Sequence, residues 1–403
     1  MSSNETLANP YQHETRWLLQ GGMLLFIYTV VIGILNGLDL VEFEKGYRLA
    51  HLHVGTLAWI TGAVFAGALV LFTSGGNRSG LISWFAVATP LVAAGYNIAF
   101  LTTTNITRPI MGTLMLVLLL GFAVWGVQRA RSTEMSVPHL GLLAGLLTSI
   151  LGGLFGVLLG LRISNPDIGI AESTGMAHPA AMIVGFLVPV GMAFAEWTLR
   201  PESVKTPASI AGWLQIGLPF VGGLLIVVGI LSDFMPLIGV SMPCHILGLV
   251  IFLVRMVPTT LKTSWLSVET ARYGTVAGIF LVVNIVILMY FIITYVIPDD
   301  VDNVPRRLML ALDHSIFVGT LTMAIIPFIA TQSITRISAL VEHVIFASMT
   351  LGTTGFVAGL LLDSDVLVRI STPILGFGLL FAILIHVRGM GHPGVALGRL
   401  VGK

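Results

Sequence analysis

Long apolar runs, separated by short polar breaks, occupy most of the chain. Each run has about the twenty residues that a helix needs to cross the hydrocarbon core of a membrane. The breaks, for example 75–78 and 299–302, are rich in Gly, Asn, Asp and Arg. We expect twelve spanning helices, at residues 17–38, 51–73, 82–104, 109–128, 139–161, 176–197, 209–231, 236–257, 273–296, 308–331, 340–362 and 365–387. The pattern predicts an all-α integral membrane domain over 17–387, with polar tails at 1–16 and 388–403.

The composition agrees with this picture and excludes several classes of protein. Of the 403 residues, 56% are hydrophobic and 10% are charged, with a mean hydropathy of +0.96. Soluble domains carry about a quarter charged residues, so a water-soluble enzyme is excluded and the lipid bilayer is the expected partner. A net charge of +1 provides no basic field for nucleic acid. The single cysteine, Cys244, excludes an intrachain disulfide and a thiolate-rich metal site.

The distribution of basic residues between the loops predicts the orientation. Thirteen of the 20 Lys and Arg residues lie on the side of the two termini, and the other seven are Lys45, Arg48, Arg108, Arg162, Arg306, Arg307 and Arg369. Basic residues are enriched in cytoplasmic loops. Both termini are therefore expected in the cytoplasm, in a multi-pass protein of the cell (inner) membrane.

This orientation sorts the ten histidines into two groups. Those expected at solvated or interfacial places on the cytoplasmic side are His13, His139, His343, His386 and His392. Those in the outer halves of the second, sixth, eighth and tenth spans are His51, His53, His178, His245 and His314. Ionisable groups inside spans are costly and usually face the interior of the bundle with a partner. The outer histidines are therefore candidates for a site.

The spacing of these histidines suggests an internal repeat. Positions 53 and 178 are 125 residues apart, positions 178 and 314 are 136 apart, and each interval contains four spans. The sequence Val54-Gly55-Thr56-Leu57 returns as Val318-Gly319-Thr320-Leu321, and Val184-Gly185 follows the middle histidine. The spacing predicts a pseudo-threefold bundle of four-helix repeats, in which the second, sixth and tenth spans are equivalent.

Imidazoles at one depth point to a metal or to haem. Neutral histidine is a common ligand of iron, copper and zinc. With no thiolate cluster and few buried carboxylates, haem and a histidine-bound copper are the candidate cofactors. The sequence does not decide which of His51 and His53 faces inward, since they lie about 200° apart around an ideal helix.

Several neighbours of these histidines are candidates for supporting roles. Outer-side arginines that would pair with haem propionates, or with lipid headgroups, are Arg48, Arg306 and Arg307. Asp313 and Glu172 are expected to orient imidazoles through hydrogen bonds. Cys244 is adjacent to His245, and we interpret it as a buried inert cysteine rather than a copper ligand.

The span count, the repeat and the histidine positions resemble the catalytic subunit of haem–copper oxidases. Arg48-Leu49-Ala50-His51 is similar to the Arg-x-x-His that opens the corresponding helix of nitric oxide reductases. The resemblance implies that His51 ligates a low-spin haem, with His314 opposite it. In such a protein one b-type haem is expected at His51 or His53 together with His314, and copper or a second haem at His178 and His245. The chain departs from the reductases because Ile316 stands where a second histidine is expected, residues 209–231 contain no histidine, and position 182 is Met182 instead of tyrosine. A complete oxygen-reductase site is therefore not expected.

A second resemblance is to the NnrS family of histidine-rich membrane proteins that bind haem and copper. The family's signature resembles His-x-His-x-Met-x-x-Gly-Phe, and this chain divides it between His51-Leu52-His53 and the sixth span. Residues 313–319 and 335–336 are also similar to the later histidine-containing helix of the family. The matching sixth-span residues are His178, Met182, Gly185 and Phe186. The resemblance implies a membrane haem protein of electron transfer, nitric oxide or respiratory metabolism, with an electron-donor protein or a partner subunit.

Two other functions remain open at this point. Twelve spans are common in secondary transporters, and Pro90, Pro219 and Pro327 inside spans could break helices, although a kink is the favoured interpretation. A non-catalytic scaffold that keeps the oxidase fold is the third possibility.

Overall fold

The computed structural model describes residues 9–73, 78–102, 105–335 and 337–391. All regular structure in these residues is helical, and twelve spans are long and apolar enough to cross a membrane. This confirms the predicted all-α, twelve-span membrane bundle. Arg336, His392 and most of the two predicted tails lie outside the described residues. The first helix begins at Gln12, so part of the predicted N-terminal tail belongs to the first span.

Nine of the spans are formed by single long helices. They are α1 (Gln12–Gly37), α4 (Gly80–Thr102), α5 (Thr107–Ala130), α6 (Val137–Ser164), α9 (Ile210–Ser232), α10 (Met235–Thr260), α11 (Thr270–Phe291, continued by the π-helix η4, Ile292–Val296), α14 (Ala339–Leu361) and α15 (Asp365–Arg388). Two short 3₁₀-helices, η3 (Pro201–Lys205) and η5 (Val301–Asn303), lie in connecting segments. Continuous helices satisfy the backbone hydrogen bonds that lipid cannot satisfy.

The second, sixth and tenth spans are each interrupted by a π-helix. The second consists of α2 (Lys45–Val54), η1 (Gly55–Ile60) and α3 (Thr61–Leu71); the sixth of α7 (Thr174–Pro179), η2 (Ala180–Leu187) and α8 (Val188–Leu199); the tenth of α12 (Arg306–His314), η6 (Ser315–Thr322) and α13 (Met323–Gln332). Each π-helix begins within two residues of a histidine and contains the glycine of a Val-Gly pair. At Gly319 the backbone approaches Phe280 so closely that a Cβ atom would collide with its ring. π-Helical turns are rare and frequently lie at functional sites.

These three interrupted spans form the centre of the bundle. In their most apolar stretches 94, 83 and 72% of the residues are buried, against 33–56% in the other nine spans. The π-helices η1 and η2 both contact η6. The surrounding spans expose large apolar side chains such as Leu24, Trp84 and Leu91, as expected for surfaces that face lipid.

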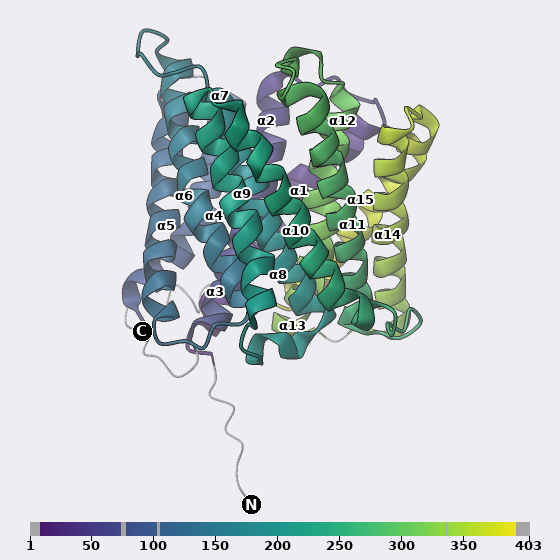
Figure 1. The fold of residues 1–403 in the computed structure, drawn as a ribbon. Helices are drawn as coiled ribbons and strands as arrows, with labels where there is room; N and C mark the ends of the chain where they lie inside the picture. Colours follow the sequence, from purple (N-terminus) through teal and green to yellow (C-terminus); the bar gives the residue numbers. More distant parts are fainter. Residues whose placement is uncertain (1–8, 74–77, 103–104, 336, 392–403) are drawn as a thin grey trace, which may run out of the picture.

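The two ends of the bundle can be told apart by the positions of its helices. Figure 1 shows α2, α7 and α12 at one end and α3, α8 and α13 at the other. The beginning of α1 lies beside the ends of α13 and α15, because Arg16 Nε donates to the Gln332 carbonyl (2.9 Å) and Gln20 Nε2 to the Val387 carbonyl (3.3 Å). We call this end the terminal half of the bundle and the opposite end, with α2, α7 and α12, the far half.

Buried charges of the terminal half are paired with one another. Glu196 accepts two hydrogen bonds from Arg255, at 2.7 and 2.8 Å, and a third from Gln215 at 3.0 Å. The fully buried Arg272 donates to His343 Nδ1 at 2.6 Å and lies 3.6 Å from Glu342. A buried charge needs such partners because it has lost its hydration. These pairs stabilise the terminal half.

Candidate functional site

A cavity of about 320 Å³ lies in the far half of the bundle, between α1, α2, α12, α14 and α15. Ligand sites in proteins measure about 300–1,000 Å³ and are mostly apolar, with a few polar groups that fix the ligand. Here the apolar lining is interrupted by a small polar set, which includes His51, His314, Asp313, Arg48 and Arg306. Both central spans that carry this set are interrupted by π-helices at the depth of the cavity floor, where Gly55, Trp59 and Thr322 line it.

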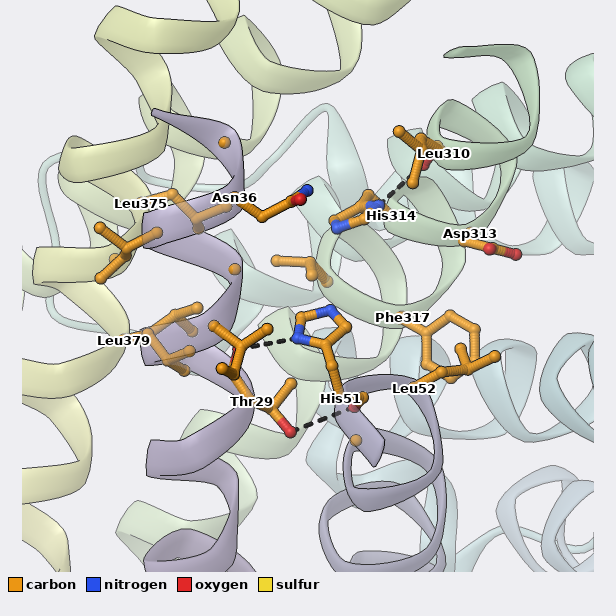
Figure 2. Close-up of a pocket in the computed structure, with 18 of the residues that line it drawn as sticks. Thr29, Asn36, His51, Leu52, Leu310, Asp313, His314, Phe317, Leu375 and Leu379 are labelled. Carbon is orange, nitrogen blue, oxygen red and sulfur yellow. Dashed lines mark hydrogen bonds between the residues drawn. The ribbon is translucent and has the colours of Figure 1, made fainter. Parts of the chain in front are cut away.

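His51 of α2 and His314 of α12 project into the cavity toward one another (Figure 2). His51 Nδ1 lies 2.9 Å from the carbonyl oxygen of Thr29, and His314 Nδ1 lies 2.8 Å from that of Leu310. A carbonyl oxygen only accepts hydrogen bonds, so Nδ1 is the protonated nitrogen in both neutral rings. The lone pair of each imidazole is therefore on Nε2, the arrangement in which histidine ligates a metal.

Aromatic side chains complete the walls of this cavity. Phe26 and Trp59 stack with ring centres 4.5 Å apart, and the Trp59 indole donates to the Thr322 hydroxyl at 2.9 Å. Phe356 lies 4.8 Å from the His314 ring. Neither Phe26 nor Phe356 could be recognised from the sequence, since a single aromatic residue in an apolar span gives no periodic signal. Their surfaces suit a flat apolar ligand.

The three predicted arginines have different positions. Arg48 and Arg306 line the cavity. Arg307 does not belong to the lining in the described residues, and it forms ion pairs with Asp363 (2.9 Å) and Asp365 (2.5 Å). Arg48 and Arg306 both belong to the first turns of far-half helices, so their backbones lie toward the far end of the bundle.

The structure corrects the expected roles of two carboxylates. Asp313 lines the cavity but points away from the two imidazole rings (Figure 2), and its Oδ1 is buried without a hydrogen-bond partner among the described residues. Glu172 is exposed and lies 3.3 Å from Arg162. The carbonyl of Leu310 orients His314 and that of Gly152 orients His178, at 2.8 Å each. A backbone carbonyl is fixed in position, so it can replace a carboxylate in this role.

The remaining far-half histidines lie apart from the cavity lining. His53 and His178 lie together, with ring centres 6.3 Å apart and planes at 8°. His245 is fully buried in α10, with its ring close to Gly222 of α9 and with Nδ1 bonded to the Ser241 carbonyl at 2.8 Å. The expected partner of His178 was His245, and the structure places His53 beside it instead. In the described part of the chain no three His, Cys, Asp or Glu residues come together as a metal site.

Two terminal-half histidines are buried, although their positions in the sequence predict solvated or interfacial places. His139 Nε2 donates to the Leu71 carbonyl at 3.0 Å, and its Nδ1 lies 2.7 Å from the Ser136 hydroxyl. His386 is also buried. Positions near the predicted ends of spans are shielded here by loops and neighbouring helices, which hydropathy does not reveal.

The chain matches no family model and no curated protein.

Proposed function

We propose that this protein is a membrane haem protein in which His51 and His314 ligate one b-type haem for electron transfer. The observation that carries the proposal is the far-half cavity, into which two spans each direct one imidazole with an available Nε2. A haem bound there supplies a one-electron redox centre.

The residues of the cavity fit this cofactor in both shape and chemistry. The lining is mostly apolar and includes the aromatic surfaces of Phe26, Trp59 and Phe356, against which a macrocycle packs. The carbonyls of Thr29 and Leu310 hold the two imidazoles in one tautomer and orientation. Fixed ligands of this kind lower the reorganisation required during electron transfer.

Arg48 and Arg306 provide the positive charge that haem propionates require. Both guanidinium groups belong to the lining, at the ends of α2 and α12 that lie toward the surface of the far half. Charge-assisted hydrogen bonds from arginine to carboxylates are stronger than neutral ones and can be bidentate. These two residues would hold the propionates at the water interface.

The ligand set favours electron transfer over the reduction of oxygen or nitric oxide. The chain provides one imidazole from each of two spans, and with both engaged in holding a haem the bound group would supply electron transfer rather than a site for a gas. The electron donor would be a separate protein or a partner subunit that docks on the outer side. The protein's role in respiratory or nitric oxide metabolism would then be to accept electrons from this donor and pass them on.

The proposal includes a pseudo-threefold arrangement and an orientation. Three features that support the repeat are the π-helices of the second, sixth and tenth spans, their central positions, and the histidine that precedes each π-helix. An excess of Lys and Arg on the terminal side supports cytoplasmic termini in the inner membrane. An oxidase-like ancestry would account for both.

Absorption spectroscopy of the purified full-length protein tests the proposal. We expect sharp reduced bands typical of bis-histidine haem, and we expect His51→Ala and His314→Ala each to lose one haem per chain in the pyridine haemochrome assay. His139→Ala, which removes a buried histidine of the terminal half whose two ring nitrogens are bonded within the protein, serves as the matched control and should keep its haem. Added imidazole should restore haem binding to the two ligand variants, which a purely structural role would not explain. Unchanged haem in both would refute the assignment.

A second candidate function is secondary transport, and Asp313 favours it. Its carboxyl group lines the cavity, and Oδ1 has no partner among the described residues. An ionisable group inside a membrane domain often binds a substrate or a coupling proton. A colourless protein that takes up a substrate in liposomes, and loses uptake in Asp313→Asn, would support transport instead of electron transfer.

A further inference from the structure

The ninth span, formed by α11 and η4, is the most apolar of the twelve, yet it carries a fully buried amide, Asn284. A polar group inside a span costs free energy unless hydrogen bonds compensate it. Asn284 Nδ2 donates to the Leu312 carbonyl at 2.8 Å and to the Ser315 hydroxyl at 3.0 Å. These two acceptors stand immediately before and after the dipeptide Asp313-His314. Asn284 therefore holds the backbone segment that carries a histidine of the cavity.

This segment is the junction between an α-helix and a π-helix. His314 is the last residue of α12, and Ser315 is the first residue of η6. A π-helical turn accommodates about one more residue than an α-helical turn, which rotates the side chains on one side of it by about 100° relative to those on the other. The place where η6 begins thus determines the direction of the His314 ring. In the structure that direction is into the cavity, toward His51 (Figure 2).

The hydrogen bonds at the junction form a closed network. The Ser315 hydroxyl donates to the Leu312 carbonyl at 2.8 Å, so it accepts from Asn284, and both amide hydrogens of Asn284 are used. Asn284 Oδ1 is buried without a partner among the described residues. A leucine of similar size would avoid the cost of this unpaired oxygen if packing were the only requirement. The donors of Asn284, rather than its volume, therefore account for an amide at this position.

The rest of the tenth span is fixed by contacts of its own. Phe280, one turn before Asn284 on α11, closes on the backbone at Gly319 of η6. The Trp59 indole of η1 donates to the Thr322 hydroxyl, at the end of η6, at 2.9 Å. Because η6 is held from this side, a change at the junction would turn α12 and its histidine instead of α13.

The sixth span contains a contact of the same kind that does not act on the cavity. Thr148 of α6, which is also buried, donates to the Gly185 carbonyl of η2 at 2.7 Å. Among the described residues, none from the sixth span lines the cavity. Thr148 therefore supports a π-helix without affecting either cavity histidine, and it provides an internal control.

We infer that Asn284 is a positioning residue, which directs the His314 imidazole into the cavity by holding the junction of α12 and η6. It acts through Leu312 and Ser315 and does not itself line the cavity. Because His314 is a proposed haem ligand, the inference rests on the proposed function.

Electron paramagnetic resonance of the oxidised, purified protein tests the inference, because the g-values of a bis-histidine haem depend on the relative orientation of the two imidazole planes. Asn284→Leu removes both donors at similar volume, and Ser315→Ala is a milder variant that keeps the test possible if Asn284→Leu does not fold. We expect both to shift the g-values, and Asn284→Leu to release haem to an excess of a haem-acceptor protein about tenfold faster, since two hydrogen bonds are lost. Thr148→Val should leave the g-values and the release rate unchanged.

Two results would overturn the inference. A lower unfolding temperature in Asn284→Leu with unchanged g-values would show that the amide only joins two spans, as interhelical hydrogen bonds in membranes commonly do. Equal shifts of the g-values in Thr148→Val would show that the effect is not specific to the tenth span.

A colourless wild type would refute the proposed function and leave the position of the ring to be tested without haem. The His314 ring centre lies 4.8 Å from that of Phe356, whose ring current displaces the imidazole proton signals. Nuclear magnetic resonance of histidine-labelled protein measures these signals, which are identified by their absence in His314→Ala. We expect them to move in Asn284→Leu and to stay in Thr148→Val. Signals unchanged in Asn284→Leu would overturn the inference.

Discussion

The far and terminal halves of the bundle use the same residue types in opposite ways. Every far-half histidine bonds through Nδ1 to a backbone carbonyl and keeps the Nε2 lone pair: His51, His53, His178, His245 and His314. In the terminal half His139 uses both ring nitrogens on protein groups and His343 accepts from a buried arginine, and His386 is the exception, because neither of its ring nitrogens has a partner among the described residues. The carboxylates follow the same rule, since Glu196 is paired with Arg255 whereas Asp313 Oδ1 has no partner among the described residues.

The paired polar groups of the terminal half serve stability, whereas the unpaired lone pairs of the far half are available for ligand binding. A buried charge that is paired within the protein loses its compensation when its partner is removed, which destabilises the bundle. Polar groups that keep an unused lone pair in a buried place carry a cost that a ligand can offset. We therefore expect substitutions in the two halves to affect different measurements.

The largest effect is expected from Arg255→Ala, which leaves the Glu196 carboxylate buried without its cation. Removing one partner of a buried ion pair costs about 3–5 kcal/mol. We expect thermal unfolding in detergent to shift to a much lower temperature, while protein purified in the cold keeps its full haem content. Arg255→Met combined with Glu196→Gln removes both charges and should recover most of the stability. Haem loss in Arg255→Ala without a lower unfolding temperature would contradict the view that the terminal half stabilises the protein and only the far half binds haem.

A smaller effect, confined to the far half, is expected from His51→Met. The thioether can still ligate haem iron, and methionine in place of histidine raises the reduction potential. We expect haem to be retained and its midpoint potential to rise by on the order of 100 mV, because axial ligands set haem potentials over a range of about 0.8 V. Redox titration of the visible spectrum measures this change. The matched variant His386→Met lies in the terminal half and should leave the potential unchanged.

The sequence was sufficient to predict the twelve spans but not the direction in which each side chain faces. Length and hydropathy define a span in lipid, and the twelve predicted spans correspond to the observed ones. The second span is buried on nearly all sides, so it has no polar face to show whether His51 or His53 points toward a given neighbour. The π-helix η1 also changes the angular relation between residues above and below it.

The pairing of His178 with His53, and the carbonyls that orient the imidazoles, could not be predicted for a related reason. Each depends on contacts between spans that are distant in sequence, for example His178 with Gly152 and His53 with Phe100. A backbone carbonyl leaves no trace in the residue pattern. Asp313 and Glu172 were predicted to orient the imidazoles only because carboxylates can be recognised in a sequence, whereas backbone carbonyls cannot.

The neighbouring residues Arg306 and Arg307 provide a sharper comparison within the far half. Arg306 lines the cavity, whereas Arg307 is paired with Asp363 and Asp365. Loss of a cation near the haem disfavours the reduced, more negative form, so we expect Arg306→Gln to lower the potential by about 20–60 mV, equivalent to roughly 0.5–1.4 kcal/mol for one electron. We expect Arg307→Gln to leave it unchanged and to alter stability by less than about 1 kcal/mol, as for other surface ion pairs. An equal shift in both variants would mean that the propionates do not lie beside Arg306.

The smallest effects are expected from two glycine substitutions that compare the cavity with the neighbouring histidine pair of His53 and His178. A Cβ atom at Gly33 of α1 would lie 3.3 Å from His51 Cε1, and one at Gly156 of α6 would lie 3.0 Å from His178 Cε1. Contacts this close tilt a ring slightly without removing its nitrogen, at a cost of up to about 1 kcal/mol. Low-temperature electron paramagnetic resonance of the oxidised protein measures the tilt at a haem iron. Gly33→Ala should change the signal of the haem held by His51, and Gly156→Ala should leave it unchanged because His178 does not line the cavity. An equal change in both variants would contradict the assignment of the haem to His51 and His314.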